Sequence, residues 1–177
     1  GSKEGIKKGM NVIAGSGLVG IVTDVGPNFA KVRSIIDDSS NVSSMVLTTK
    51  DNFNVGGSLK SMNQDKVLPF TELRDEDDKV KVGDPVVTSY VSDQYQEGIL
   101  IGYIASIEKN ANNLTKSGSI TPVVDFRHLH EVLVITQLKN TDEAQKDIQS
   151  QAQRETEMIL ETETGKQTES SKQAGGE

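Results

Sequence analysis

The chain has 177 residues, of which 34% are hydrophobic and 4% aromatic, so its core must be built mainly from valine, isoleucine and leucine. The formal net charge of −7 is opposite in sign to the basic face that nucleic-acid binding requires, and we therefore expect no nucleic-acid partner. The absence of cysteine excludes thiol catalysis, disulfides and thiolate metal sites, and no apolar run is long enough to cross a membrane.

The first residues, Gly1-Ser2, resemble the remnant of a cleaved expression tag, and we interpret residues 1–9 as this remnant and a linker. From residue 10 to residue 139, short apolar runs alternate with clusters of glycine, asparagine, aspartate and serine. This spacing is typical of β-sandwiches and small barrels, and no amphipathic helical period of useful length interrupts it. The expected strands are Asn11–Ala14, Val19–Val25, Lys31–Ile36, Ser44–Thr48, Gly57–Met62, Lys66–Phe70, Val86–Thr88, Ile99–Ile107, Ile120–Val124 and Glu131–Leu138.

Two of these stretches resemble each other. GLVGIVTDV, which begins at Gly17, matches GILIGYIASI, which begins at Gly98, when Gly20 is aligned with Gly102. The repeat predicts an all-β protein of two small six-stranded-type barrels related by internal duplication. The first barrel would span residues 10–75 and the second residues 79–139, joined at the charged segment LRDEDDK. Chance similarity between strands rich in valine, isoleucine and glycine is the alternative.

Several glycines have an architectural role in this reading. Gly83-Asp84-Pro85 is a turn signal, because glycine tolerates a positive φ and proline fixes φ at the next position. We expect the Asp84 carboxylate to accept a backbone N–H within this turn. Glycines inside or beside strand patterns mark bulges, bends or close backbone approach. The glycines of this second kind are Gly17, Gly20, Gly98 and Gly102.

Residues 140–177 differ from the rest of the chain. They contain 4 basic and 9 acidic side chains and no aromatic residue, whereas residues 1–139 contain 15 basic and 17 acidic side chains. Such a segment buries too little apolar surface to offset about 1–2 kcal/mol of backbone ordering per residue. The composition predicts a disordered or transiently helical acidic tail.

The sequence offers little for catalysis. His128 and His130 lie beside Asp125 and could hold a metal with it, but surface histidines beside a strand are the simpler interpretation. Ser16 lacks the context of a protease nucleophile and has no base tied to it by sequence. The acidic run Asp75–Asp78 lacks the alternating spacing of a calcium loop and is expected to form solvated turns. We therefore predict no enzyme activity, no cofactor and no metal.

An ordered set of motifs resembles the extracytoplasmic domain of the rod shape-determining MreC family. The set is VIAGSGLVGIVTDVGPNFAKVRSIIDDSSNVSSMV, then VGDPVVTSYVSDQYQEGILIGYIASIE, then VVDFRHLHEVLVI, and it covers roughly residues 10–138. Two positions depart from the family pattern: Tyr90 stands where glycine is common, and Gln96 where proline is common. These departures concern the conformation of the loop Tyr90–Glu97.

The resemblance implies two barrels distantly like those of trypsin-type proteases, without the catalytic residues. It implies a scaffold outside the bacterial cell membrane, anchored by an upstream transmembrane helix. Its partners would be a class B penicillin-binding protein, MreD, and RodZ or MreB where present, together with further copies of itself. Loop aromatics that a small core does not need are the expected partner-binding residues: Phe29, Phe53, Tyr90 and Tyr95. The alternatives are a secreted ligand-binding or adhesion barrel and a degenerate protease-like domain.

Overall fold

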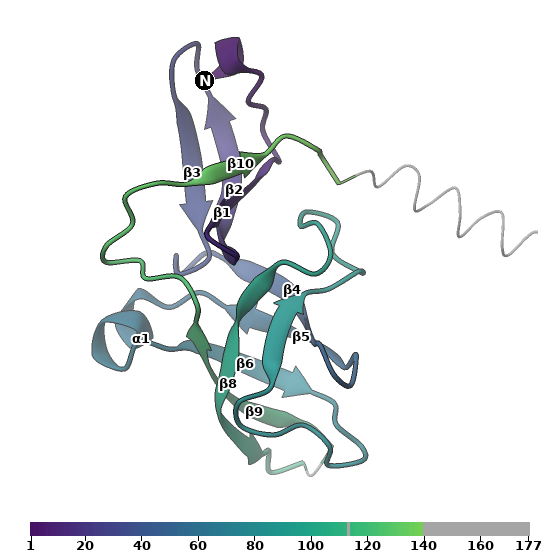
Figure 1. The fold of residues 1–177 in the computed structure, drawn as a ribbon. Coiled ribbons are helices and arrows are strands. Elements are labelled where there is room, and N and C mark those ends of the chain that lie inside the picture. Colours follow the sequence, from purple (N-terminus) through teal and green to yellow (C-terminus); the bar gives the residue numbers. More distant parts are fainter. Residues whose placement is uncertain (113, 140–177) are drawn as a thin grey trace, which may run out of the picture. The chain divides into compact units, whose positions relative to one another are not determined.

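The computed structural model describes residues 1–112 and 114–139, and the regular secondary structure of this part is almost all β (Figure 1). One short α-helix and one 3-10 helix accompany ten strands. In chain order the elements are η1 (Ser2–Glu4), β1 (Asn11–Ala14), β2 (Gly17–Val25), β3 (Ala30–Ser34), β4 (Asn41–Val46), β5 (Asn52–Gly56), α1 (Leu59–Gln64), β6 (Leu68–Leu73), β7 (Pro85–Thr88), β8 (Leu100–Lys109), β9 (Lys116–Pro122) and β10 (Leu133–Ile135). The predicted tail, residues 140–177, lies outside the described residues.

A closed six-stranded barrel forms the larger body of the fold. Its strands run β8-β7-β4-β5-β6-β9, and pairing between β8 and β9 completes the circle. Neighbouring strands in the barrel are antiparallel throughout. A closed barrel has no unpaired strand edge, which removes the commonest route to unwanted strand addition. The predicted all-β class is confirmed, and so is one of the two six-stranded-type barrels that the sequence predicted.

The smaller body is an antiparallel sheet of four strands in the order β10-β1-β2-β3, seen above the barrel in Figure 1. A parallel contact between Gly17 and Leu100 joins β2 to β8 and thus the two bodies. Both bodies take strands from either side of residues 75–79, because β4–β6 pair with β7–β9 and β10 returns to β1. The predicted ranges 10–75 and 79–139 therefore do not coincide with the two sheets. The order of strands in the sequence does not predict this arrangement, because strands that pair can be far apart along the chain.

Two apolar cores match the two bodies. The barrel core includes Leu18, Phe70 and Ile104, all at most 2% exposed. The second core is built around Val12 of β1 and Val22 of β2 in the four-stranded sheet. Phe126 packs against both cores. Valine, isoleucine and leucine dominate both, as the low aromatic content requires.

Gly20 and Gly102 occupy corresponding positions in the two bodies. Gly20 pairs with Val12 of β1 and Ser34 of β3, while Gly102 pairs with Val86 of β7 and Pro122 of β9. A Cβ on either glycine would collide with the carbonyl oxygen of the strand beside it. A register shift follows each glycine at the same place, after Val22 in β2 and after Ile104 in β8. The internal duplication itself stays a prediction.

One expected strand is wrong and one strand was missed. The expected strand Gly57–Met62 is wrong, because residues 59–62 belong to α1. This helix starts at an N-cap where Ser58 Oγ accepts the N–H of Ser61 at 3.1 Å. A capping serine outweighs the weak apolar pattern there. The missed strand is β5, whose asparagines at 52 and 54 alternate with buried Phe53 and Val55. Asparagine is depleted in strands, so propensity alone gave no signal for β5.

Candidate partner-binding surface

The four aromatic residues expected to bind partners divide into two groups. Phe53 is 6% exposed and packs against Phe70 with ring centroids 5.1 Å apart, while Tyr95 is 3% exposed. Both belong to the barrel core. Phe29 and Tyr90 are each 54% exposed. Of these four aromatic residues, Phe29 and Tyr90 are therefore the two that a partner can reach.

Tyr90 stands on the connection between β7 and β8, beside Val91, which is 59% exposed. The Asn52 side chain donates to the Tyr90 hydroxyl at 3.4 Å. The Lys139 ammonium donates to the Tyr90 carbonyl at 2.9 Å. These two contacts attach the loop tip to β5 and to the end of the described chain. We call Tyr90 and Val91 the apolar tip.

Polar side chains from both bodies hold the rest of this loop. Asn11 of β1 is 2% exposed, and its amide donates to the Gln94 carbonyl at 2.9 Å and accepts the Gln96 N–H at 2.7 Å. Thr88 Oγ1 accepts the Ile99 N–H at 2.8 Å and donates to the Gln96 carbonyl at 2.5 Å. Side chains from both sheets form hydrogen bonds with the backbone of this loop. The loop should therefore lose little conformational entropy when a partner binds the apolar tip.

Phe29 lies in the turn between β2 and β3, far along the sequence from the apolar tip. The Gly26 N–H donates to the Phe29 carbonyl at 2.9 Å, and a Cβ on Gly26 would overlap the Phe29 ring. The first residues of the chain pack on this turn, where the Ser2 N–H donates to the Gly26 carbonyl at 2.9 Å. The ring is thus held over the turn beside the incoming chain.

The predicted turn glycines have clear structural roles. Gly83 has φ 93° and Gly98 has φ 81°, a region that favours glycine. The Asp84 carboxylate accepts the Lys81 N–H at 2.9 Å, which closes the turn before β7. A Cβ on Gly17 would overlap the side chains of Val123 and Val124, so this glycine allows β2 to pack closely against the connection from β9 to β10.

The candidate catalytic residues lie on the surface. His128 Nδ1 is 2.8 Å from Asp125 Oδ2, and the two side chains are 74% and 65% exposed. The hydrogen bond from His128 lowers the pKa of Asp125. Ser16 is an exposed turn residue with no hydrogen bond to either partner. Across residues 1–112 and 114–139, no group of three or more histidine and carboxylate side chains is placed to hold a metal ion.

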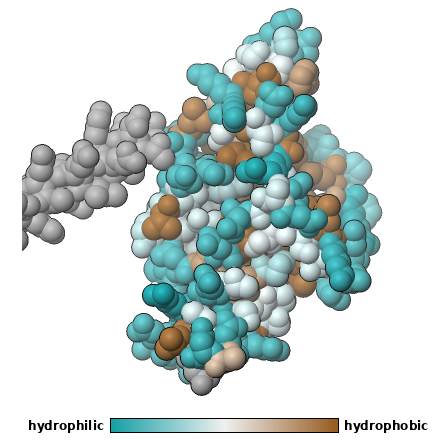
Figure 2. Space-filling model, turned by 180° about the vertical axis from the view of Figure 1, so that it is seen from behind, coloured by the Kyte–Doolittle hydropathy of each residue, from teal (hydrophilic) through white to brown (hydrophobic). Residues whose placement is uncertain are grey.

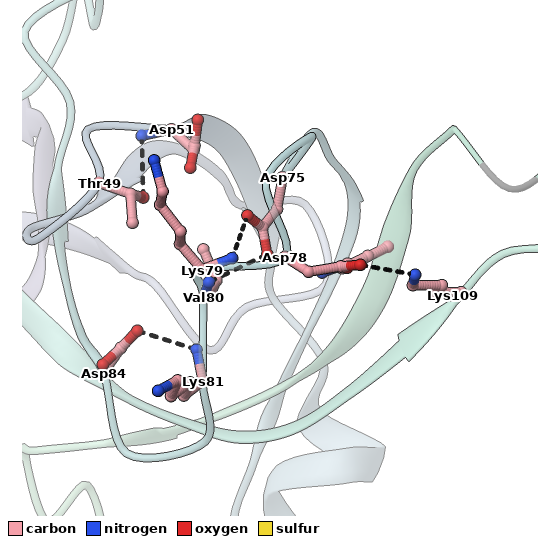
Figure 3. A network of polar contacts seen from close by, with 10 residues as sticks. Thr49, Asp51, Asp75, Asp78, Lys79, Val80, Lys81, Asp84 and Lys109 are labelled. Carbon is pink, nitrogen blue, oxygen red and sulfur yellow. Dashed lines mark hydrogen bonds and ion pairs between the residues drawn. The ribbon is translucent and has the colours of Figure 1, made fainter.

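In the acidic run at residues 75–78, Glu76, Asp77 and Asp78 form the exposed turn that was predicted, but Asp75 is buried, which corrects the prediction at that residue. The Asp75 side chain is 1% exposed and forms an ion pair with Lys116 Nζ at 2.6 Å. Its carboxylate also accepts the backbone N–H groups of Lys79 at 2.9 Å and Val80 at 3.0 Å (Figure 3). Asp78 contacts Lys116 at 2.6 Å and Lys109 at 2.9 Å.

The pKa shifts in this network follow from its contacts. Burial acts to raise the pKa of Asp75, but the hydrogen bonds from Lys116 and two backbone N–H groups outweigh it and lower the pKa. Hydrogen bonds from Lys116 and Lys109 lower the pKa of Asp78 to about 2. The network ties the segment between β6 and β7 to strands β8 and β9. These contacts stabilise the fold. The sequence did not predict the contact between Asp75 and Lys116.

Comparison with known proteins identifies the family of this chain. Residues 1–136 match the family described as "Rod shape-determining protein MreC, barrel core". The chain belongs to the MreC family. The cell shape-determining protein MreC of Listeria monocytogenes is 32% identical over 137 residues, which are 76% of this chain and 45% of that protein. The chain therefore spans less than half the length of this curated relative.

Solved MreC structures share the architecture. MreC from Pseudomonas aeruginosa is 21% identical, with a TM-score of 0.67 over 76% of this chain and 84% of that one. MreC from Helicobacter pylori, solved in complex with penicillin-binding protein PBP2, is 15% identical, with a TM-score of 0.54 over 70% of this chain and 74% of that one. At these identities the likeness establishes the fold. Within the described residues, no helix is both long and apolar enough to cross a bilayer.

Proposed function

We propose that this chain is the extracytoplasmic barrel domain of a non-catalytic scaffold that organises peptidoglycan synthases during cell elongation. Membership of a cell shape-determining family supports the general role. In this proposal an upstream transmembrane helix anchors the protein at the outer face of the bacterial cell membrane. MreD, and RodZ or MreB where present, are further proposed partners, together with other copies of the chain.

The proposed direct partner is a class B penicillin-binding protein. The observation that carries this proposal is the apolar tip, an exposed tyrosine and valine on a loop fixed by hydrogen bonds to both bodies. Hydrophobic residues on the face seen in Figure 2 form small separate patches among polar ones. Recognition by a few anchors suits such a surface better than one broad apolar face, and tyrosine is a frequent anchor. The Helicobacter pylori relative, solved with PBP2, makes this class of partner reasonable.

A scaffold role also agrees with the surface chemistry of the described residues. The pair His128 and Asp125 is mostly exposed, with no hydroxyl nucleophile hydrogen-bonded to the histidine. A general base in a nucleophilic site needs such a partner within hydrogen-bond reach. We therefore assign no hydrolase or transferase activity to the domain.

Capture from solubilised membranes tests this proposal. Immobilised chain should retain a class B penicillin-binding protein, identified by mass spectrometry, and the Tyr90→Ala/Val91→Ala variant should retain much less. Leu114→Ala is the matched control, because Leu114 is an exposed apolar residue (77%) in the β8–β9 turn. Retention that is equal for the wild type and the tip variant would contradict the assignment of the apolar tip.

A further inference from the structure

A hollow of about 400 Å³ lies between α1 and the connection from β9 to β10. Its apolar lining includes Ile36, Met62, Val124 and Phe126. Ile36 and Met62 pack against the barrel core, Val124 belongs to the second core, and Phe126 touches both. The hollow therefore lies where the two cores meet, and its apolar lining is held in place by packing against them.

Two cations stand among the residues that line the hollow, Lys66 and Arg127. Neither forms an ion pair with any residue in the described part of the chain. Arg127 Nη2 makes one long contact, 3.5 Å from the Asn63 carbonyl. Both side chains belong to exposed residues on a chain whose net charge is −7. The positive charges of Lys66 and Arg127 would therefore complement a negatively charged ligand.

The one carboxylate in the lining is already engaged. Asp125 Oδ2 faces His128 Nδ1 at 2.8 Å, and Asp125 Oδ1 accepts the Arg127 N–H at 3.0 Å. These contacts fix the turn that carries Arg127 at the mouth of the hollow. Asp125 thus holds the Arg127 backbone, and its carboxylate is not paired with the Arg127 guanidinium.

We propose that this hollow binds an extended peptide segment of a partner protein in which an aliphatic side chain adjoins a carboxylate. The aliphatic group would cover Met62 and Phe126, and the carboxylate would pair with Arg127, whose planar guanidinium suits bidentate carboxylate binding. Apolar hollows of this size with a few polar groups at the mouth are typical of ligand sites. The inference rests on the proposed scaffold role, since it names the chemistry of a partner segment.

A fluorescein-labelled hexapeptide of alternating leucine and glutamate is the probe, measured by fluorescence anisotropy with the full 177-residue chain. We expect saturable binding that weakens with added salt, and about tenfold weaker binding to the Arg127→Gln variant, the loss expected for one charge-assisted hydrogen bond. Lys60→Gln is the matched control, because Lys60 is an exposed cation on α1 outside the hollow. Its affinity should equal that of the wild type.

Absence of saturable binding, equal binding of a leucine-lysine hexapeptide, or an unchanged affinity for Arg127→Gln would each overturn this inference. A second measurement separates it from the scaffold proposal. Arg127→Gln is tested for binding to the periplasmic part of a class B penicillin-binding protein. If that protein binds the wild type and Arg127→Gln equally, the hollow is not a docking site for it and the scaffold role stands. If it binds neither while the leucine-glutamate peptide binds the wild type, the hollow stands and the partner assignment fails.

Discussion

Removal of the Asp75 carboxylate is the sharpest test of the fold's polar network. In the Asp75→Ala variant, the N–H groups of Lys79 and Val80 lose their acceptor, and Lys116 loses one of its two carboxylate partners. The Asp75 side chain is 1% exposed and that of Lys116 is 11% exposed, so water replaces these contacts poorly. The variant should fold less stably than any surface substitution in the same segment.

The magnitude follows from the individual contacts. Breaking a buried ion pair costs about 3–5 kcal/mol when a charge is left alone, and a buried N–H without an acceptor costs about 1–3 kcal/mol. Asp78 stays 2.6 Å from Lys116 Nζ in the variant, so the charge on Lys116 keeps a partner. The two N–H groups that lose their acceptor then dominate the cost, about 2–6 kcal/mol together, and we expect a loss of about 3 kcal/mol.

Urea unfolding followed by far-UV circular dichroism measures this loss. Asp77→Ala is the matched control, since the Asp77 side chain is 68% exposed and its ion pair is with the exposed Lys79 ammonium. Its stability should equal that of the wild type within error, as is usual for exposed pairs. A loss for Asp75→Ala below about 1 kcal/mol, or no larger than that for Asp77→Ala, would refute the reasoning.

The same network predicts a pH dependence. Because the pKa of Asp75 is lowered in the folded state, its contribution is complete above the unfolded value of about 3.9. That contribution is lost as the pH falls through the lower folded value. The free energy of unfolding of the wild type should therefore fall below about pH 4, and Asp75→Ala should lack its share of this fall.

Three further predictions concern the backbone and the partner loop. Gly83→Ala should cost about 1 kcal/mol or more, because φ is 93° at this position; an unchanged melting temperature would remove the turn assignment. Gly20→Ala and Gly102→Ala should each cost about 1–3 kcal/mol in urea unfolding, because each Cβ would meet a neighbouring backbone; a large loss at only one of them would argue against equivalent positions. Asn11→Ala should accelerate amide hydrogen exchange in residues 89–97, measured by mass spectrometry beside the exposed control Asn41→Ala; unchanged protection would mean that Asn11 does not hold the loop.

Local patterns were enough to predict most of the strands and several turns. Apolar runs bounded by glycine and asparagine located nine of the ten strands within a few residues. The turn at Gly83-Asp84 was readable because a positive φ and a carboxylate acceptor are local properties. The match between Gly20 and Gly102 was readable because a strand that packs backbone against backbone requires glycine at that point.

Burial and pairing between distant residues could not be predicted from the same patterns. Phe53 and Tyr95 look like loop aromatics in sequence, but Phe53 lies on the missed strand β5 and the Tyr95 side chain is buried in the barrel core. Asp75 reads as one of several solvated acids, and only the fold brings Lys116, 41 positions away, against it. The order of strands in the barrel likewise depends on contacts across residues 75–79.

The most direct test of the scaffold proposal is the affinity of the chain for the periplasmic part of a class B penicillin-binding protein, measured by isothermal titration calorimetry. The account predicts saturable, weak binding, because the apolar tip offers only two exposed apolar anchors. Tyr90→Ala/Val91→Ala should abolish the heat of binding, and Leu114→Ala should leave it unchanged. No heat of binding with the wild type, or equal affinity for the wild type and the tip variant, would contradict the proposed role of the apolar tip.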